Sequence, residues 1–389
     1  MSRAALRRAT YVVLAVAAFA TRWVFIDVQS IDYTTFLSQW WDFIVAHGHL
    51  RALADAGFSN YNTPYLFLMA LASYVPVPAI VAIKCISFAF DLALAGVASR
   101  LAHALAPGRP ELGVAVFGVV CFLPTVVMNS AIWGQCDAIY ATFCLLSILA
   151  LVRGKPWLSA AWFGVAFAFK LQALFLLPVL AGVMIVNRLR VRALALAPVT
   201  FLACLVPALV AGRSLMSQLA IYPGQIEDPS GMQGVGAQVL THNAPTPYAW
   251  LPRPTPSWWL YVGLGVTALV VLSFGIWLLW RRSMLSPSQV VLVAATALLL
   301  VPVLLPDMHD RYYYVAEVLS VVACLADRRY LVPAIGIQVA SISTYLAFLT
   351  GTPLMPLASA AGVAVLSALA AAATLILALR RPTGATPLS

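Results

Sequence analysis

Charged residues are scarce in this sequence, and their scarcity excludes most classes of soluble protein. Only 9% of the 389 residues are Asp, Glu, Lys or Arg, whereas 62% are hydrophobic. A soluble surface needs about a quarter of its residues charged. The mean hydropathy of +0.93 points the same way. The sequence therefore predicts an all-α, polytopic membrane protein that forms a single domain over residues 1–389.

Signatures of cofactor and metal binding are missing as well. The chain contains neither a P-loop nor a GxGxxG turn between a strand and a helix. All its cysteines except Cys136 fall inside apolar runs, so we expect neither a disulfide framework nor a cysteine metal site. His47, His49, Asp32 and Asp42 form no recognisable ligand pattern. We expect no cofactor and no metal.

The basic residues predict the topology. They give a net charge of +10, but they occur as short clusters between apolar runs and not as one patch, which argues against a nucleic-acid partner. The positive-inside rule places each cluster in the cytosol. The clusters are Arg3/Arg7/Arg8, Arg100/Arg109, Arg153/Lys155, Arg188/Arg190/Arg192, Arg281/Arg282, Arg328/Arg329 and Arg380/Arg381.

Apolar runs of roughly 20 residues predict the membrane spans. They lie near 9–26, 79–102, 112–128, 134–152, 193–211, 258–280, 288–305, 312–326, 330–349 and 357–379. The piece 157–187 has basic residues at both ends, so it must cross out and back, turning near Lys170. This gives about twelve spans, some of them short, with a cytosolic tail at 380–389 and external loops at 27–78 and 212–257.

The two external loops differ in character. After Asp32, apolar residues recur at helical spacing, which predicts an amphipathic helix lying in the membrane interface. The stretch 65–74 is too short to cross and is expected in the interface too. The second loop is rich in Pro, Gly, Asn and Gln, which predicts irregular backbone.

Polar groups near the outer membrane surface are functional candidates, because burying them there is costly. Asp32 is the candidate general base, and the alternative is a solvated loop acid. Asp27 reads better as an anchor at a helix end. Lys170 could grip a phosphate at the hairpin turn, and the alternative is an amine that reaches the headgroups.

Two further clusters occupy the same predicted surface. In Trp133-Gly-Gln135-Cys-Asp137, a donor and a carboxylate could orient a sugar hydroxyl, but Asp137 fits an N-terminal helix cap equally well. Met308-His309-Asp310-Arg311 offers an imidazole and a guanidinium for a phosphate, and the alternative is an interfacial charge cluster. Lys84, Ser87 and Asp91 share one helix face, where an internally satisfied polar seam is the better interpretation.

These motifs resemble those of the GT-C class of membrane glycosyltransferases, which use polyprenyl-phosphate sugars. Asp32-Tyr33 with Gln39-Trp40 is similar to the acidic motif of the endoplasmic-reticulum glucosyltransferases that use dolichyl-phosphate glucose, and 60–65 resembles their tyrosine-proline motif. His309-Asp310-Arg311 resembles their His-Glu-Lys, with both charges kept and both residue types changed. The motifs at 133–137 and 169–172 resemble those of bacterial members and of glycolipid-anchor mannosyltransferases.

The resemblance implies a site and a reaction. Asp32 would be the catalytic base, and Lys170, His309 and Arg311 would bind the donor phosphate. The substrate-binding residues would be Tyr33, Asn60, Tyr61, Asn62, Trp133, Gln135, Asp137 and Gln172. The enzyme would be an inverting hexosyltransferase, for mannose or glucose, that moves one sugar from a polyprenyl-phosphate donor to a hydroxyl of a lipid-linked or cell-envelope glycan.

Location and alternatives follow from the same features. We expect a bacterial inner (plasma) membrane protein in contact with membrane lipids, whose active site faces the periplasm or exterior. A lipid-sugar flippase or transporter is the alternative from another class, and it predicts polar residues at the bilayer midplane. An oligosaccharide polymerase or ligase is a third possibility, and the identity of the lipid-linked donor would separate it.

Overall fold

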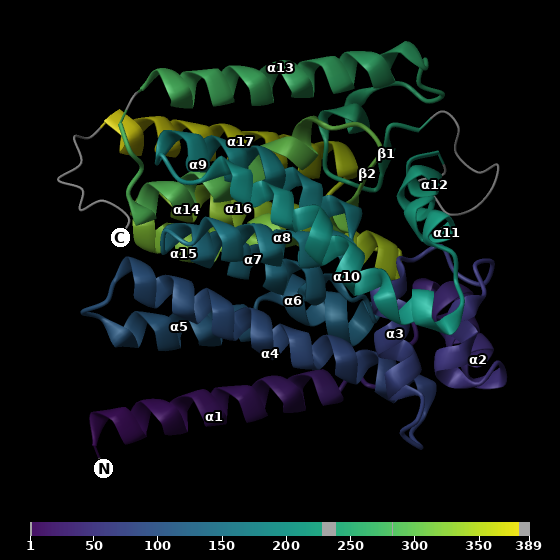
Figure 1. Cartoon of the computed structure of the whole chain (residues 1–389). Coiled ribbons are helices and arrows are strands. Elements are labelled where there is room, and N and C mark those ends of the chain that lie inside the picture. Colours follow the sequence, from purple (N-terminus) through teal and green to yellow (C-terminus); the bar gives the residue numbers. More distant parts are fainter. Residues whose placement is uncertain (1, 228–238, 282, 381–389) are drawn as a thin grey trace.

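Long helices lie side by side in one bundle, with short elements gathered at one end (Figure 1). A computed structural model of the chain describes residues 2–227, 239–281 and 283–380. The short helices α2 (Ser38–Ala46) and α3 (Thr63–Ala72) lie at the end that carries Asp32, which we call the site end. Helix α1 begins and α17 ends at the opposite end, which we call the far end.

The remaining elements complete the bundle and its two ends. The longer helices are α1 (Arg3–Trp23), α4 (Ala79–Leu105), α7 (Asp137–Val152), α10 (Leu196–Ala211), α13 (Trp258–Trp280), α14 (Pro287–Leu304), α16 (Leu331–Thr350) and α17 (Leu357–Arg380). The shorter ones are α5 (Pro110–Cys121), α6 (Pro124–Val127), α8 (Pro156–Phe169), α9 (Leu177–Val186), α11 (Leu215–Leu219), α12 (Ile221–Glu227) and α15 (Tyr314–Ala326). Tight 3-10 or π turns are Tyr33–Leu37, His49–Ala54, Met128–Trp133, Leu171–Leu176, Val191–Ala195, Pro247–Trp250, Asp310–Tyr313 and Arg328–Tyr330. Strands β1 (Thr241–His242) and β2 (Met308–His309) pair in parallel.

Several helices have the length and composition of membrane spans. Seven in the described ranges qualify, and an eighth results if α5 and its bent continuation to Trp133 count as one span. The chain is therefore treated as membrane-spanning. The predicted count of about twelve stays a prediction, because the helices at 137–152, 156–169 and 171–186 are shorter than a full span.

Burial separates the central helices from the peripheral ones. In α14, 72% of the most apolar window is buried inside the protein, compared with 17% in α13 and 6% in α1. All of these helices are apolar, so their exposed faces suit lipid and their buried faces suit the core. Helix α14 begins with a capping box, in which Ser286 Oγ accepts from the Gln289 N–H at 3.3 Å. The capping box stabilises the first turn of this largely buried helix.

One predicted span is broken, and the break shapes the site end. Helix α5 and the stretch Pro124–Trp133 meet at an angle of 49°. Proline has no N–H to continue the helix and its ring clashes with the preceding turn, which explains a bend at Pro124. The second half ends in a π turn, and Gly134 follows in the left-handed region at φ +80°. The bend and this turn bring Trp133, Gln135 and Asp137 to the site end.

The second external loop is more regular than its composition predicted. Residues 215–219 and 221–227 form helices α11 and α12, while residues 228–238 lie outside the described residues. After Gly212, neither proline nor glycine occurs before Pro223, so residues 213–222 contain no helix breaker. Strand β1 then pairs Thr241 with Met308 and His242 with His309. The loop is thereby joined to the segment that carries Arg311.

A buried ion pair joins α1 to α4. Arg22 Nε lies 2.6 Å from Asp91 Oδ2, and the two side chains are 1% and 0% exposed. Arg22 also donates to the carbonyls of Ala18 and Cys121. Asp91 Oδ2 accepts from Ser130 Oγ at 2.5 Å as well. Removing one partner of such a pair leaves a buried charge without compensation.

We predict that Arg22→Met destabilises the protein by about 3–5 kcal/mol, because it strands the Asp91 carboxylate. Adding Asp91→Asn should restore much of the loss, since the amide is neutral and still bonds Ser130. Thermal unfolding in detergent measures both. The control is Arg329→Met, whose Asp327 partner lies nearer the surface and which should cost under about 1 kcal/mol. Equal losses in Arg22→Met and in the double variant would contradict the explanation.

Candidate active site

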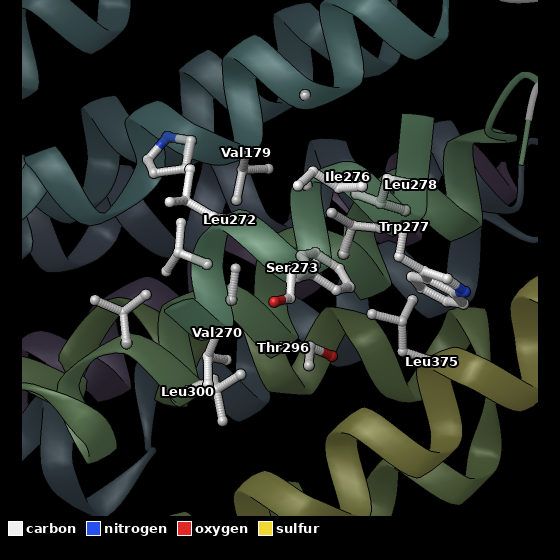
Figure 2. Close-up of a pocket in the computed structure, with 18 of the residues that line it drawn as sticks. Val179, Val270, Leu272, Ser273, Ile276, Trp277, Leu278, Thr296, Leu300 and Leu375 are labelled. Atoms are coloured by element: carbon white, nitrogen blue, oxygen red, sulfur yellow. The ribbon is translucent and has the colours of Figure 1, made fainter. Parts of the chain in front are cut away.

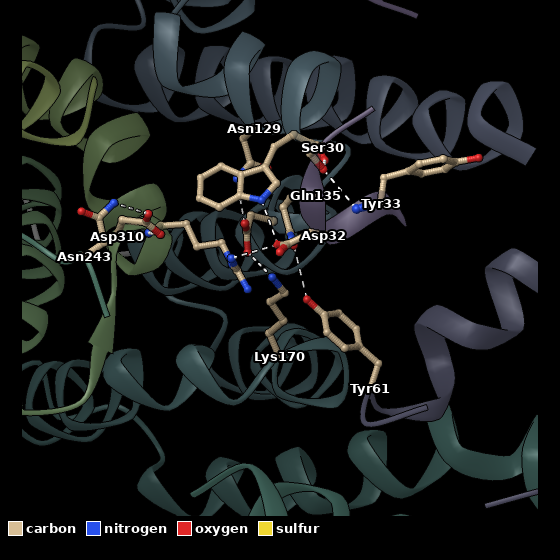
Figure 3. A network of polar contacts seen from close by, with 12 residues as sticks. Ser30, Asp32, Tyr33, Tyr61, Asn129, Gln135, Lys170, Asn243 and Asp310 are labelled. Carbon is tan, nitrogen blue, oxygen red and sulfur yellow. Dashed lines mark hydrogen bonds and ion pairs between the residues drawn. The ribbon is translucent and has the colours of Figure 1, made fainter. Parts of the chain in front are cut away.

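Asp32 lies at the centre of a polar network at the site end, and Figure 3 shows it among its partners. Its Oδ2 accepts from Trp133 Nε1 at 2.8 Å and from Gln135 Nε2 at 2.5 Å. Arg311 NH1 lies 3.4 Å from the same oxygen. No hydrogen bond within the described part of the chain uses Asp32 Oδ1. One carboxylate oxygen is thus anchored, and the other is available to accept a proton.

The two neutral donors are themselves held rigidly. The Trp133 ring stacks on Phe348 with centroids 4.5 Å apart and meets the edge of Tyr345 at 5.1 Å. The Gln135 N–H donates to the Asn129 carbonyl at 2.9 Å. Ser30 Oγ donates to the Trp133 carbonyl at 2.6 Å, which ties the two segments together. The geometry around Asp32 therefore exists before any ligand binds.

Arg311 links Asp32 to the neighbouring aromatic ring. Its guanidinium carbon lies 5.3 Å from the Trp133 ring centroid, within the range of a cation–π interaction. Burial is the largest single influence and acts to lower the pKa of Arg311, but Asp32, Tyr61, Asp137 and Asp310 together raise it well above its usual value. Its Nε is buried and has no hydrogen-bond partner among the described residues. Arg311 thus keeps a donor that an incoming anion can use.

Lys170 forms a second ion pair close to the first. Its Nζ donates to Asp137 Oδ1, while Asn129 Nδ2 donates to Asp137 Oδ2 at 2.8 Å. Burial is the largest single influence and acts to lower the pKa of Lys170, but Asp137, Tyr61 and Cys136 together raise it above its usual value, so the ammonium stays charged. The Lys170 charge is therefore already paired. Asp137 is the first residue of α7, and its two oxygens bond side chains of other segments in addition to any capping role.

Tyr61 and Asn62 connect the first external loop to this network. The Tyr61 hydroxyl donates to Gln135 Oε1 at 3.3 Å, and Lys170 Nζ lies 5.5 Å from its ring centroid. Burial raises the pKa of Tyr61, which keeps the phenol protonated as a donor. Asn62 Nδ2 donates to the Ala168 carbonyl at 2.8 Å, close to Lys170 in the chain. Both residues hold the loop against the end of α8.

Four of the predicted site residues lie farther from the centre of the polar network than the others. The Tyr33 side chain points away from Asp32 (Figure 3). Asn60 is exposed, and its carbonyl accepts from Gln225 Nε2 at 2.7 Å. His309 stacks on His242 with centroids 4.7 Å apart. Gln172 lies beside Tyr312, where its hydrogen bond opposes the burial that raises the Tyr312 pKa. The structure gathers the other predicted residues more tightly than these.

The polar seam on α4 positions the site, a role that sequence reasoning did not assign to it. Lys84 Nζ donates to the carbonyls of Phe25 and Val28, in the segment that leads to Asp32. Ser87 Oγ donates to the Gln135 carbonyl at 2.8 Å. With Asp91 bound to Ser130, all three seam residues hold segments that bear the network. The polar side chains of the seam form their hydrogen bonds within the protein, as expected. Their partners show that the seam positions the segments that bear the network.

Asn243 is a second residue that sequence reasoning missed. Its Nδ2 donates to Asp310 Oδ2 at 3.1 Å and to the Thr344 carbonyl at 2.8 Å. It adopts a left-handed conformation at φ +57°, which Asn tolerates better than most residues. Asp310 Oδ1 accepts the Arg311 N–H at 2.9 Å, so Asn243 holds the base of the Arg311 side chain in place. Its contacts are nonlocal, so no sequence signal could have revealed them.

The comparison with protein families identifies the class of protein. The model for glycosyltransferase family 87 matches residues 58–306, more than half of the chain. The chain belongs to glycosyltransferase family 87. It is therefore a membrane glycosyltransferase. No curated protein matched the chain.

The family 87 match and the polar network overlap only in part. Asp137 and Lys170 lie inside the matched residues, whereas Asp32 precedes them and Arg311 follows them. The contact between Arg311 and Asp32 joins both flanks to the matched region in space. Among the described residues, no three His, Cys, Asp or Glu side chains are placed to hold a metal ion. The charged side chains of the network are the carboxylates of Asp32, Asp137 and Asp310 and the cations of Lys170 and Arg311.

Asp310 should make stability depend on pH. Burial raises the pKa of its carboxyl to about 7, although Arg311 acts to lower it. In the unfolded chain an Asp titrates near about 3.9, so between about pH 4 and 7 the folded state binds more protons. The contribution of Asp310 to stability is therefore full below about pH 4 and is lost as pH rises through 7.

We predict that Asp310→Asn flattens this part of the pH profile, because an amide does not titrate. The measurement is the melting temperature in detergent between pH 4 and 8, taken as the difference between wild type and variant at each pH. Wild type should lose stability relative to Asp310→Asn as pH rises. A difference that is constant with pH would contradict a raised pKa at Asp310.

Proposed function

We propose that this family 87 enzyme transfers one hexose, mannose or glucose, from a polyprenyl-phosphate donor to a hydroxyl of a lipid-linked or cell-envelope glycan, with inversion at the anomeric carbon. The observation that carries the proposal is the arrangement around Asp32. One of its oxygens is anchored by three donors, and the other is left for a proton. Two cations, Arg311 and Lys170, lie in the same network.

In the proposed reaction, Asp32 Oδ1 removes the proton from the acceptor hydroxyl as its oxygen attacks the anomeric carbon. The new bond forms while the bond between that carbon and the phosphate oxygen breaks. The polyprenyl phosphate leaves with the electron pair of that bond. A single displacement inverts the anomeric centre. Phosphate is a good leaving group, so no general acid is required.

The leaving phosphate would be stabilised by the cations of the network. Arg311 contacts Asp32 only at 3.4 Å and has a free buried Nε, so its planar guanidinium can take a phosphate in a bidentate manner. Lys170 is paired with Asp137 and would act more as a fixed positive charge beneath the phosphate. His309, beside Tyr312, would contribute from the β2 side.

A cavity of about 600 Å³ supports a lipid-linked donor. It lies between α9, α13, α14 and α17 and is lined almost entirely by apolar side chains, among them Val179, Trp277 and Leu375 (Figure 2). The α14 residues Leu300 and Leu304 line it too, and the chain runs directly from there to the segment of Arg311. An isoprenoid tail could occupy this cavity while its phosphate reaches Arg311.

The site would face away from the cytosol, in a bacterial plasma membrane. The basic clusters at 153–155 and 188–192 lie at the opposite ends of α8 and α9 from Lys170. By the positive-inside rule, the site end is then external. Nucleotide sugars are cytosolic, so an external transferase needs a donor carried on a lipid. Family membership favours transfer over the flippase alternative, and a polymerase or ligase would use a donor that carries a glycan chain.

The deciding experiment incubates the purified enzyme with a panel of polyprenyl-phosphate monosaccharides and a membrane glycolipid extract, and follows loss of the sugar. Turnover of one monosaccharide donor supports the proposal. Turnover only of donors that carry an oligosaccharide would support the polymerase or ligase instead. Turnover of a nucleotide sugar alone would overturn the lipid-donor proposal.

We predict that Asp32→Asn lowers the transfer rate by about 10² to 10⁴, the usual contribution of a general base. The amide can still accept hydrogen bonds from Trp133 and Gln135, so donor binding should change little. Asp27→Asn is the matched control, because Asp27 is an exposed acid in the same loop and outside the network. An essential Asp27 together with a dispensable Asp32 would reassign the base.

We predict that Arg311→Ala weakens donor binding by at least about tenfold, and that Arg311→Lys recovers only part, since a point charge lacks the bidentate fork. Equilibrium binding of the donor to purified protein measures both. Lys170→Met is best combined with Asp137→Asn, so that no carboxylate is stranded. If Lys170 and Arg311 serve one phosphate, adding Arg311→Ala to that pair costs less than the sum. Strict additivity would assign the two cations to separate sites.

A further inference from the structure

A second, basic cavity lies at the far end, between the turn that follows α7 and the turn that follows α9. It measures about 520 Å³, and Lys155, Arg188 and Arg190 line it together with Trp157. No acidic side chain lines it. None of the three cationic side chains makes a hydrogen bond or an ion pair with any residue in the described ranges. The cavity therefore concentrates positive charge without an internal counterion.

The two turns have the same backbone design with different residues. After α7, Gly154 is left-handed at φ +65°, and the Lys155 N–H donates to the Ala150 carbonyl at 2.9 Å. After α9, Arg188 takes the equivalent place at φ +55°, and the Leu189 N–H donates to the Met184 carbonyl at 2.8 Å. Glycine adopts this conformation at lower cost than arginine. What Arg188 adds at this position is its side chain.

The second turn is also anchored firmly. Asn187 is 2% exposed, donates to the Leu285 carbonyl at 2.9 Å and accepts the Leu285 N–H at 2.8 Å. This reciprocal pair fastens the end of α9 to the loop before α14. Arg188 and Arg190 therefore extend from a fixed backbone and not from a loose loop. The Arg188 and Arg190 side chains are exposed, so an anion can approach both from solvent.

The surroundings indicate an anion attached to a lipid. Helix α8 begins at Pro156 in the cavity wall, and the unpaired N–H groups of a first helical turn attract negative charge. Trp157 and Leu158 are 41% and 43% exposed beside it, at the level where α8 enters the bundle. Tryptophan favours the membrane interface, where one side of the ring meets lipid and the other meets water. Charge and apolar surface thus adjoin.

We propose that this cavity binds the phosphate headgroup of an anionic phospholipid in the leaflet at the far end, with the lipid chains against Trp157 and Leu158. The cations and the start of α8 supply the charge complementarity. Helix α8 spans 14 residues between the cavity and Lys170, a separation of about 20 Å. The lipid site is therefore distinct from the Asp32 network and does not depend on the function proposed above.

The test is a titration of purified protein in neutral detergent with phosphatidylglycerol, followed by native mass spectrometry, with phosphatidylcholine as the uncharged reference. Arg188→Gly is the informative variant, because it removes the cation and relieves the left-handed backbone. Its melting temperature without lipid should equal or exceed that of wild type, while the Kd for phosphatidylglycerol rises about fivefold. Arg190→Ala should raise the Kd by a similar factor. The control is Arg100→Ala, an exposed arginine near the same end but outside the cavity.

Three outcomes would overturn the proposal. The first is unchanged lipid binding in the double variant Arg188→Gly with Arg190→Ala. The second is an equal loss in Arg100→Ala, which would mean that the basic surface attracts anionic lipid without a defined site. The third is displacement of phosphatidylglycerol by an equal concentration of inorganic phosphate, which would assign the cavity to a free anion. A loss confined to the cavity variants, with no displacement by phosphate, supports a lipid headgroup site.

Discussion

Moving an unpaired charge out of water costs several kcal/mol. Each buried charge in the protein interior therefore needs a partner beside it. Three ion pairs, Arg22–Asp91, Lys170–Asp137 and Arg311–Asp32, form a series of increasing exposure, from 1%/0% through 8%/2% to 15%/16%. The innermost pair fastens α1 to α4. The outermost is the longest, at 3.4 Å, and the most exposed of the three. Under the proposed function, it is the pair that a ligand would rearrange at least cost.

The same constraint explains why the site depends on α4. An apolar helix in a membrane gains little from polar residues unless they bond to something that needs them. Lys84 and Ser87 donate to backbone carbonyls of the irregular segments around Asp32 and Gln135. The broken span after Pro124 and the turn at Gly134 place donors beside Asp32, and α4 supplies the groups that this irregular backbone lacks. The irregular backbone at the site is therefore accompanied by the polar seam on α4, whose side chains hydrogen-bond to it.

The two ends of the bundle handle charge differently. At the site end, cations and carboxylates are paired with one another, as Lys170 is with Asp137 and Arg311 with Asp32. At the far end, Lys155, Arg188 and Arg190 have no acidic partner in their cavity. Such a surface suits the phosphate headgroups of the lipid site proposed above. Acidic residues number only 13 in the chain, and three of them, Asp32, Asp137 and Asp310, lie in the network at the site end.

The sequence by itself determined the helices and the candidate residues, because both signals are local. The span predicted at 258–280 coincides with α13, and those near 79–102 and 357–379 differ from α4 and α17 only at their ends. The sequence predicted Asp32, Lys170 and Arg311 as functional candidates because burying polar groups near the membrane surface costs free energy. The tertiary structure alone decided the pairings: Lys170 bonds Asp137, and Tyr33 points away from its neighbour Asp32. Pairing depends on which helix ends meet in space, and hydropathy along the chain carries no information about that.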